Sequence, residues 1–229
     1  MIPPGTKAVF FDAVGTVLMP HPGAVTIYTE MARRYGLETD AIRPRLIEAF
    51  HDEDWLDERA NWVTSEDRER ERWRTIVRRT LPGAPDDCFD ELYQHFADPE
   101  AWRVPADAPG VFATLAERGL RLGLASNYDS RLDSVLAGRP ELVRLAERVV
   151  ISSRVGVRKP GAGFFRRVVE LADCEADEVL LVGDDYGNDY LGATAAGMQA
   201  ILLDPENRRP DIPQRVTSLA GLLEQLRGL

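Results

Sequence analysis

Four widely separated points of the sequence carry side chains suited to nucleophilic catalysis on an anionic substrate. Asp12 and Ser126 each stand at the end of a short apolar run, and Lys159 stands in an Arg-Lys-Pro tripeptide. The fourth point is the acidic segment 183–189, Gly-Asp-Asp-Tyr-Gly-Asn-Asp. Together these groups would supply a carboxylate nucleophile, a hydroxyl and an ammonium that bind an anion, and oxygen ligands for a divalent metal ion.

The elements that must position these groups are short strands alternating with helices. Apolar runs predict strands at about 7–11, 121–125, 148–152, 178–183 and 199–203. The helices expected beside them lie at about 109–118, 130–137, 162–172, 189–196 and 217–227. This alternation is typical of parallel βαβ units, so we expect an α/β fold with a three-layer, doubly wound, Rossmann-like core. Because functional groups collect at the carboxyl ends of parallel strands, all four points would meet at one edge of the sheet.

A block of helices interrupts the alternation after the first strand. Apolar residues recur at helical spacing between 24 and 35, 42 and 50, 73 and 81, and 88 and 96. Asp40 and Ser65 are the expected N-caps of the second and third helices. The acidic run 52–54 is interpreted as a solvated turn, and the tryptophans as packing rather than as a substrate wall. We therefore divide the chain into an α/β core, residues 1–19 and 106–229, and an all-helical insert, residues 20–105.

Composition limits the classes of protein to which the chain can belong. Of 229 residues, 44% are hydrophobic and 29% are charged, a balance typical of a folded globular protein. The net charge of −10 argues against sequence-independent nucleic-acid binding. Lys7 and Lys159 are the only lysines, so a role that needs an amine has two candidates. No apolar run approaches the ~20 residues of a membrane span, and Met1 to Thr6 lack a signal-peptide pattern, so we expect a cytoplasmic protein.

The four points, in this order, resemble the motifs of the haloacid dehalogenase (HAD) superfamily of hydrolases. The motifs are Phe-Phe-Asp-Ala-Val-Gly-Thr, Leu-Ala-Ser-Asn, Arg-Lys-Pro and Val-Gly-Asp-Asp-Tyr-Gly-Asn-Asp. Each is weak alone, but four in order, each following a predicted strand, are specific. The insert is similar to the helical C1 cap of subfamily I. Segments 126–132 and 183–198 look like an animal and bacterial subgroup of HAD-like hydrolases without an assigned activity.

The resemblance implies a Mg²⁺-dependent phosphatase that acts on a small phosphorylated metabolite, as a monomer or homodimer. Asp12 would attack phosphorus and become an aspartyl-phosphate, with Ser126 and Lys159 as its catalytic partners. The implied substrate-binding residues are Gly15, Thr16, Ser126, Asn127 and Lys159. The implied Mg²⁺ ligands are Asp12, the backbone carbonyl of Val14, Asp184 and Asp189. Cationic charge is needed because a carboxylate and a phosphate, both anions, must meet.

Val14 is the one position that departs from the phosphatase pattern. Typical phosphatases of this family have a second aspartate there, which protonates the leaving oxygen and later activates water. Valine can do neither, and loss of a general acid or base typically costs ~10²–10⁴-fold in rate. If alkyl phosphates are nevertheless hydrolysed, Asp185, Tyr186 or a carboxylate of the insert would have to supply the proton.

Two branches of the family that lack this aspartate give alternatives. The phosphonate-cleaving branch needs a lysine in the cap, and the insert contains none. The 2-haloacid dehalogenases need no general acid, because halide leaves unaided, and the insert has arginines for a substrate carboxylate: Arg33, Arg34, Arg43 and Arg45. Against this, Asp184 would repel an anionic haloacid. A dehalogenase-like hydrolase with an ester on Asp12 stays open, as does a catalytically weak phospho-ligand-binding protein.

Overall fold

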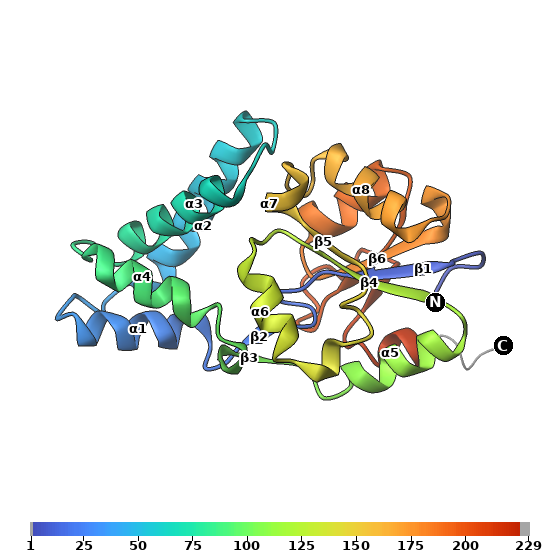
Figure 1. Cartoon of the computed structure of the whole chain (residues 1–229), viewed down its shortest axis with the longest axis horizontal. Helices are drawn as coiled ribbons and strands as arrows, with labels where there is room; N and C mark the ends of the chain where they lie inside the picture. The colour runs from blue at the N-terminus through green and yellow to red at the C-terminus, as the bar shows by residue number, and fades with distance from the viewer. Residues whose placement is uncertain (1, 225–229) are drawn as a thin grey trace.

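A parallel sheet forms the centre of the computed structural model, which describes residues 2–224 (Figure 1). Within that range it has six strands in the order β5-β4-β1-β6-β7-β8. The strands are β1 (Ala8–Phe11), β4 (Arg121–Ser126), β5 (Val149–Ile151), β6 (Val179–Gly183), β7 (Gln199–Leu203) and β8 (Arg215–Val216). The chain runs outward from β1 in both directions, so the predicted doubly wound sheet is confirmed and its carboxyl edge has a switch point beside β1.

Alternating side chains of the strands feed two separate hydrophobic cores, one on each face of the sheet. In β1, Val9 and Phe11 pack with α5 (Ala108–Glu117), α6 (Arg131–Ala137) and α10 (Gly221–Glu224). Ala8 and Phe10 pack on the other face with α8 (Ala162–Ala172) and α9 (Gly192–Ala195). All four side chains of β1 are fully buried, as expected for a strand covered on both faces. The three-layer α/β core is therefore confirmed.

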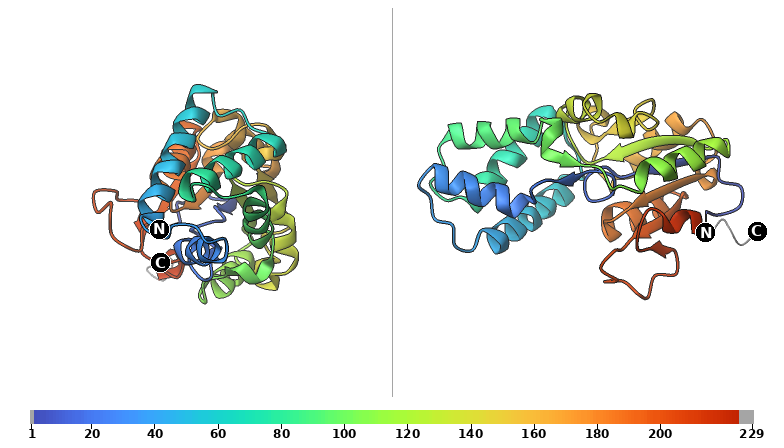
Figure 2. Two further views of the ribbon diagram at one scale, coloured as in Figure 1. Left: turned by 90° about the vertical axis from the view of Figure 1, so that its left-hand side faces the viewer. Right: turned by 90° about the horizontal axis from the view of Figure 1, so that it is seen from below.

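The helical insert projects from one end of this core (Figure 1; Figure 2, right). It consists of α1 (Ala24–Arg34), α2 (Ile42–Arg59), α3 (Glu66–Thr80) and α4 (Asp86–His95). The chain enters and leaves it through a short antiparallel pair, β2 (Met19–Pro20) and β3 (Trp102–Arg103). Short helical elements complete the fold: η1 (Pro99–Ala101), η2 (Pro140–Leu142), α7 (Ser152–Val155), η3 (Ala176–Glu178) and the π-helical η4 (Tyr186–Leu191).

Several predicted helix ends differ from the observed ones. Ser65 caps α3 as predicted, since its Oγ accepts a hydrogen bond from the Arg68 amide at 3.1 Å. The prediction that Asp40 caps α2 was wrong: Ala41, at φ 59°, occupies that position and no side chain caps the helix. The acidic run 52–54 is not a turn either, because α2 continues through it.

The C-terminal part of the core departs from prediction in length rather than in type. The helix expected at 189–196 is divided into η4 and α9. The helix expected at 217–227 begins only at Gly221, and positions 225–227 lie outside the described residues. Strand β8 was not predicted, because two residues are too few for a recognisable pattern. No helix of residues 2–224 is long and apolar enough to cross a membrane.

Candidate active site

The carboxyl edge of the sheet brings the four points of the sequence together. Asp12 follows β1, Ser126 ends β4, and Asp184 follows β6. Lys159 reaches the same place from the segment between α7 and α8. We call Asp12, Lys159, Asp184 and Asp189 the strand-edge cluster.

Lys159 is the centre of this cluster, with a side chain that is 2% exposed. Its Nζ donates to Asp12 Oδ1 and Asp189 Oδ1, both at 2.6 Å, and to the carbonyl oxygen of Ala125 at 2.8 Å. Burial by itself lowers the pKa of Lys159, but the charges of Asp12 and Asp189 outweigh it and raise the pKa above its ordinary value. The Lys159 side chain therefore stays protonated, and its ammonium bridges Asp12, the proposed nucleophile, and Asp189 of the acidic segment 183–189.

The cluster holds more carboxylate than ammonium charge. Oxygens of Asp12, Asp184 and Asp189 all lie within 4.8 Å of one another. Burial raises the pKa of Asp12 to about 6 and that of Asp189 to about 7. Asp184 opens to solvent on one side, yet desolvation of its carboxyl and the charge of Asp189 raise its pKa to about 6. Clustered oxygen donors with excess negative charge are the ligands that a hard divalent cation such as Mg²⁺ prefers.

Gly15 and Thr16 lie against Asp184. Gly15 has φ +98°, and a Cβ at this position would collide with the Asp184 carboxylate, so both the backbone conformation and the space require glycine. Thr16 is fully buried, and its Oγ1 donates to Asp184 Oδ1 at 3.1 Å. Thr16 therefore orients the Asp184 carboxylate, and Gly15 leaves the space that it occupies.

Asn127 holds the backbone of Lys159 from both sides. Its Nδ2 donates to the Lys159 carbonyl at 3.0 Å, and the Lys159 amide donates to its Oδ1 at 2.7 Å. Ser126, the preceding residue, is 1% exposed at the end of β4. Asn127 therefore links the second sequence motif to the third and fixes the backbone position of Lys159.

The residues named above as alternative proton donors are arranged differently. Asp185 Oδ1 accepts from the amides of Gly187 and Asn188, both at 2.8 Å, so its carboxylate caps η4. The Tyr186 ring stacks on Tyr190, with centroids 5.7 Å apart. Val14 is 36% exposed and faces a cavity between the insert and the core.

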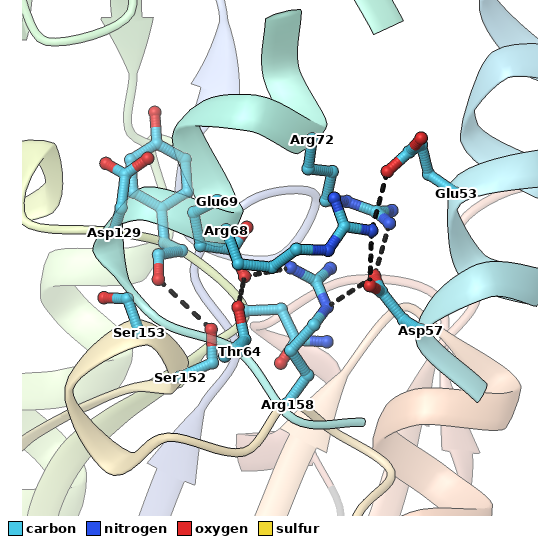
Figure 3. Close-up of polar contacts among 12 residues, drawn as sticks. Glu53, Asp57, Thr64, Arg68, Glu69, Arg72, Asp129, Ser152, Ser153 and Arg158 are labelled. Carbon is cyan, nitrogen blue, oxygen red and sulfur yellow. Dashed lines mark hydrogen bonds and ion pairs between the residues drawn. The ribbon is translucent and has the colours of Figure 1, made fainter. Parts of the chain in front are cut away.

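A second group of buried charges, which the sequence analysis missed, joins the insert to the core (Figure 3). We call it the insert–core cluster, and it consists of Glu53, Asp57, Arg68, Glu69, Arg72 and Arg158. Asp57, which is fully buried, accepts hydrogen bonds from Arg68 Nη2 at 2.7 Å and Arg72 Nη1 at 2.5 Å. Arg158 of the core pairs with Glu69 of α3, and it directly precedes Lys159 in the chain.

Further polar contacts close the insert on the core. Glu66 at the start of α3 accepts hydrogen bonds from Ser130 Oγ at 2.8 Å and Ser153 Oγ at 2.6 Å. The Thr64 amide donates to the carbonyl of Gly156 at 3.0 Å. The structure therefore shows a closed arrangement, with the strand-edge cluster at the junction of the two parts.

Two hollows border this junction. The first, the insert cavity, has a volume of about 200 Å³ and is lined by Val14, Asn127 and Arg158 together with apolar residues of the insert. The second, an outer cleft of about 890 Å³, is lined by Gly15 and Asp184 and by the segment around Arg208. Trp73 and Trp102, which the sequence analysis interprets as packing residues, line the first hollow.

Comparison with known proteins identifies the family. The family model of haloacid dehalogenase-like hydrolases matches residues 6–197. The mouse protein named haloacid dehalogenase-like hydrolase domain-containing protein 3 is 35% identical over 58% of this chain and 56% of its own length. The bovine protein of that name is 31% identical over 94% of this chain and 92% of its own. A glyceraldehyde 3-phosphate phosphatase of Methanothermobacter thermautotrophicus is 34% identical over 43% and 45%.

Solved structures agree with the fold. A putative HAD-hydrolase of Bacillus subtilis bound to magnesium, YfnB, superposes with a TM-score of 0.77 at 16% identity over 97% of this chain and 99% of its own. The L-2-haloacid dehalogenase of Xanthobacter autotrophicus superposes with a TM-score of 0.72 at 19% identity over 98% and 99%. At these identities the likeness concerns the fold and does not separate one chemistry from another. With the match of the family model, the four motifs and this fold, the chain belongs to the haloacid dehalogenase-like hydrolases.

Proposed function

We propose that this hydrolase is a Mg²⁺-dependent phosphatase that acts on a small phosphorylated metabolite through an aspartyl-phosphate on Asp12. The strand-edge cluster carries the proposal, because the Asp12 carboxylate lies against Lys159 with Asp184 and Asp189 beside it. A carboxylate that approaches a phosphoryl group needs positive charge, and three carboxylates with one ammonium leave a deficit that a divalent cation would fill. The relative named as a phosphatase supports the same class of reaction.

The chain's own residues would act in two steps. Asp12 Oδ would attack phosphorus while the bond from phosphorus to the leaving oxygen breaks, and water would then hydrolyse the aspartyl-phosphate to return the free carboxylate. Lys159 and Ser126 would hold the phosphoryl oxygens in both steps, and Asn127 would keep Lys159 in place. Val14 cannot give the leaving oxygen a proton, so in this proposal that oxygen leaves as an anion or is protonated by water.

The residues at the site fit a magnesium ion. Asp12, the backbone carbonyl of Val14 and Asp184 would hold it, with Thr16 fixing the Asp184 carboxylate. Asp189 would serve beside the ion, since its two oxygens already accept hydrogen bonds from Lys159 Nζ and the Asp185 amide. When bound, Mg²⁺ would supply positive charge that offsets the repulsion between the carboxylate and the phosphoryl group.

The insert would act as a cap over the site. In this proposal residues 20–105 are the cap and residues 1–19 and 106–229 are the core, with the β2–β3 pair as the connection. Closure of the cap would exclude water while Asp12 attacks, and the insert–core cluster would hold the closed state.

The test is a screen of phosphorylated metabolites for phosphate release by the full chain, with and without Mg²⁺. Asp12→Asn, which keeps the shape of the side chain but lacks the nucleophilic oxygen, is the control and should release none. Metal-independent chloride release from 2-chloropropionate would favour the dehalogenase-like alternative. Phosphate binding without turnover of any ester would favour the phospho-ligand-binding alternative.

A further inference from the structure

The insert cavity borders the proposed reaction site at Asn127, whose side-chain amide is hydrogen-bonded to the Lys159 backbone. Three of its lining residues are close sequence neighbours of the proposed catalytic residues: Val14 lies two positions after Asp12, Asn127 follows Ser126, and Arg158 precedes Lys159. A substrate whose phosphoryl group lies at Asp12 has two neighbouring hollows for the rest of the molecule, this cavity and the outer cleft lined by Gly15 and Asp184. The position of Val14 in the wall of the cavity favours the cavity. Its lining is thus evidence for the chemical class of that leaving group.

The wall of the cavity is mostly apolar or aromatic. Ten of its fourteen lining residues are apolar or aromatic. The six aromatic ones are Tyr28, Phe50, Trp73, Phe96, Trp102 and Tyr128. A wall of this kind favours an apolar ring, both through burial of apolar surface and through ring–ring contacts.

Many polar atoms of this wall already have partners. Trp102 Nε1 and Tyr128 Oη both donate to the carbonyl oxygen of Phe96, at 3.2 and 3.1 Å. Arg72 donates to Asp54 and Asp57, and Arg158 donates to Glu69. A sugar in the cavity would bury more hydroxyls than the remaining polar atoms can pair with, at a cost of about 1–3 kcal/mol for each unsatisfied group.

The size of the cavity and the engagement of the carboxyl group in its wall also favour an aromatic leaving group. The cavity has a volume of about 200 Å³, and a cavity of about 150 Å³ is known to accept benzene. Among the described residues that line it, Glu69 is the single carboxyl group, and Thr64 Oγ1 and Arg158 both donate to it. With valine at position 14 as well, the cavity suits a leaving group that needs no protonation.

We propose that the substrate is a monophosphate ester of a compact, apolar alcohol of the phenol type, with its ring seated in the insert cavity. The anion of such an alcohol is a weak base. This inference rests on the proposed phosphatase function and names its substrate class. The aromatic wall selects the ring, and Val14 restricts turnover to leaving groups that depart as stable anions. Sugar phosphates meet neither condition and should be poor substrates.

The experiment separates the two conditions with three esters and the full chain in Mg²⁺. Phenyl phosphate has an apolar ring and a weakly basic leaving group; cyclohexyl phosphate has a ring of similar size and a basic one; glucose 6-phosphate is polar and basic. We expect the highest kcat for phenyl phosphate and a lower KM for both ring esters than for glucose 6-phosphate. As a competitive inhibitor, phenylphosphonate should bind about tenfold more tightly than methylphosphonate.

Substitutions then locate the ring. Phe50→Ala and the milder Phe50→Leu should raise the KM for phenyl phosphate, by about tenfold for alanine, and should raise the KM for acetyl phosphate, which has no ring, by less. Ile47→Ala is the matched control, since Ile47 lies on the same helix and is 50% exposed. A lower KM for glucose 6-phosphate than for cyclohexyl phosphate, or equal binding of the two phosphonates, overturns the inference alone. No phosphate release from any ester or from acetyl phosphate overturns the proposed function, and the inference with it.

Discussion

The two buried charge clusters of this molecule lie next to each other but differ in balance. In the insert–core cluster, three buried carboxylates (Glu53, Asp57, Glu69) face three guanidinium groups (Arg68, Arg72, Arg158), and the exposed Asp54 pairs with Arg72 at its edge. In the strand-edge cluster, three carboxylates (Asp12, Asp184, Asp189) face the single ammonium of Lys159. In the balanced cluster, the buried charges pair with one another and need no further ion. The unbalanced one keeps a negative excess that a cation and an electrophilic substrate would relieve.

The chain connects the two clusters directly. Arg158 belongs to the first and Lys159 to the second, so their side chains diverge from adjacent residues toward the insert and toward Asp12. Because the Lys159 backbone is also held by Asn127, closure of the insert and the position of the ammonium depend on the same short segment. Removing charges from either cluster tests whether the two differ in role.

The largest expected effect is loss of activity when the strand-edge ammonium is removed. Lys159→Met should lower kcat/KM by about 10³-fold or more, because charge on the phosphoryl oxygens would lose its buried donor. Lys159→Arg should restore little, since a planar guanidinium is larger and shaped differently. Lys7→Met is the control: Lys7 is 56% exposed, pairs with Glu178 at the surface and should be neutral. Full activity of the arginine variant would contradict the proposed geometry.

The next effect compares the same substitution in both clusters, measured by urea unfolding without Mg²⁺. Asp57→Asn should lower the free energy of unfolding by about 3–5 kcal/mol, because it leaves buried guanidinium charge uncompensated. Asp184→Asn should leave stability unchanged or raise it, since it removes one charge from a negative excess and the amide oxygen can still accept from Thr16. Equal losses in the two variants would mean that the clusters do not differ in balance.

Magnesium should stabilise one cluster and act through Asp184. At a concentration about 100 times its Kd, the ion should add about 2.7 kcal/mol to the free energy of unfolding. Asp184→Asn should abolish this increment, whereas Arg68→Met, in the other cluster, should keep it. A shift that persists in Asp184→Asn would place the ion elsewhere.

The effect of magnesium should also depend on pH. Burial raises the pKa of Asp12 and Asp184 to about 6 and that of Asp189 to about 7, from an ordinary value of 3.8. In the metal-free protein their contribution to stability is therefore full below about pH 4 and is lost as pH rises through about 6 to 7. Mg²⁺ competes with these protons, so its Kd by calorimetry should fall over the same range. A Kd that is constant between about pH 5 and 8 would contradict this assignment.

The smallest expected effect is a gain of function at Val14. Val14→Asp should raise turnover of alkyl phosphates by about tenfold or more, a modest part of the usual contribution of a general acid. Phenyl phosphate, whose leaving group needs little protonation, should change less. A wild-type enzyme that hydrolyses alkyl and aryl phosphates equally fast would show that another residue supplies the proton.

Features of the fold and the site that depend on local sequence could be predicted, whereas contacts between residues far apart in the sequence could not. The sheet, its flanking helices and the convergence of Asp12, Ser126 and Lys159 depend on local apolar runs and strand ends, which the sequence displays. The insert–core cluster depends on contacts between α2, α3 and Arg158, at separations of up to 89 residues. One signal was available: Glu53 with Asp57, and Arg68 with Arg72, are spaced four apart on their helices, which places each pair on one face.

The insert cavity was missed for a related reason. Trp73 and Phe96 have the helical spacing of packing residues, and they do pack, but their other sides line the cavity. Spacing indicates which face of a helix is apolar and not whether a neighbour fills the space against it. Trp55 shows the same limit of residue spacing as evidence, since it was interpreted as a packing residue but its side chain is 55% exposed.

The central claim, that the unbalanced cluster surrounds a nucleophile for phosphoryl transfer, has one most direct test. The full chain is mixed with Mg²⁺ and phenyl phosphate or acetyl phosphate, quenched in acid within one turnover, digested and analysed by mass spectrometry. The account predicts a phosphoryl group on Asp12, none in Asp12→Asn, and an unchanged modification in Lys7→Met. Turnover with Asp12 unmodified at every quench time, or phosphorylation of a different residue, would contradict it.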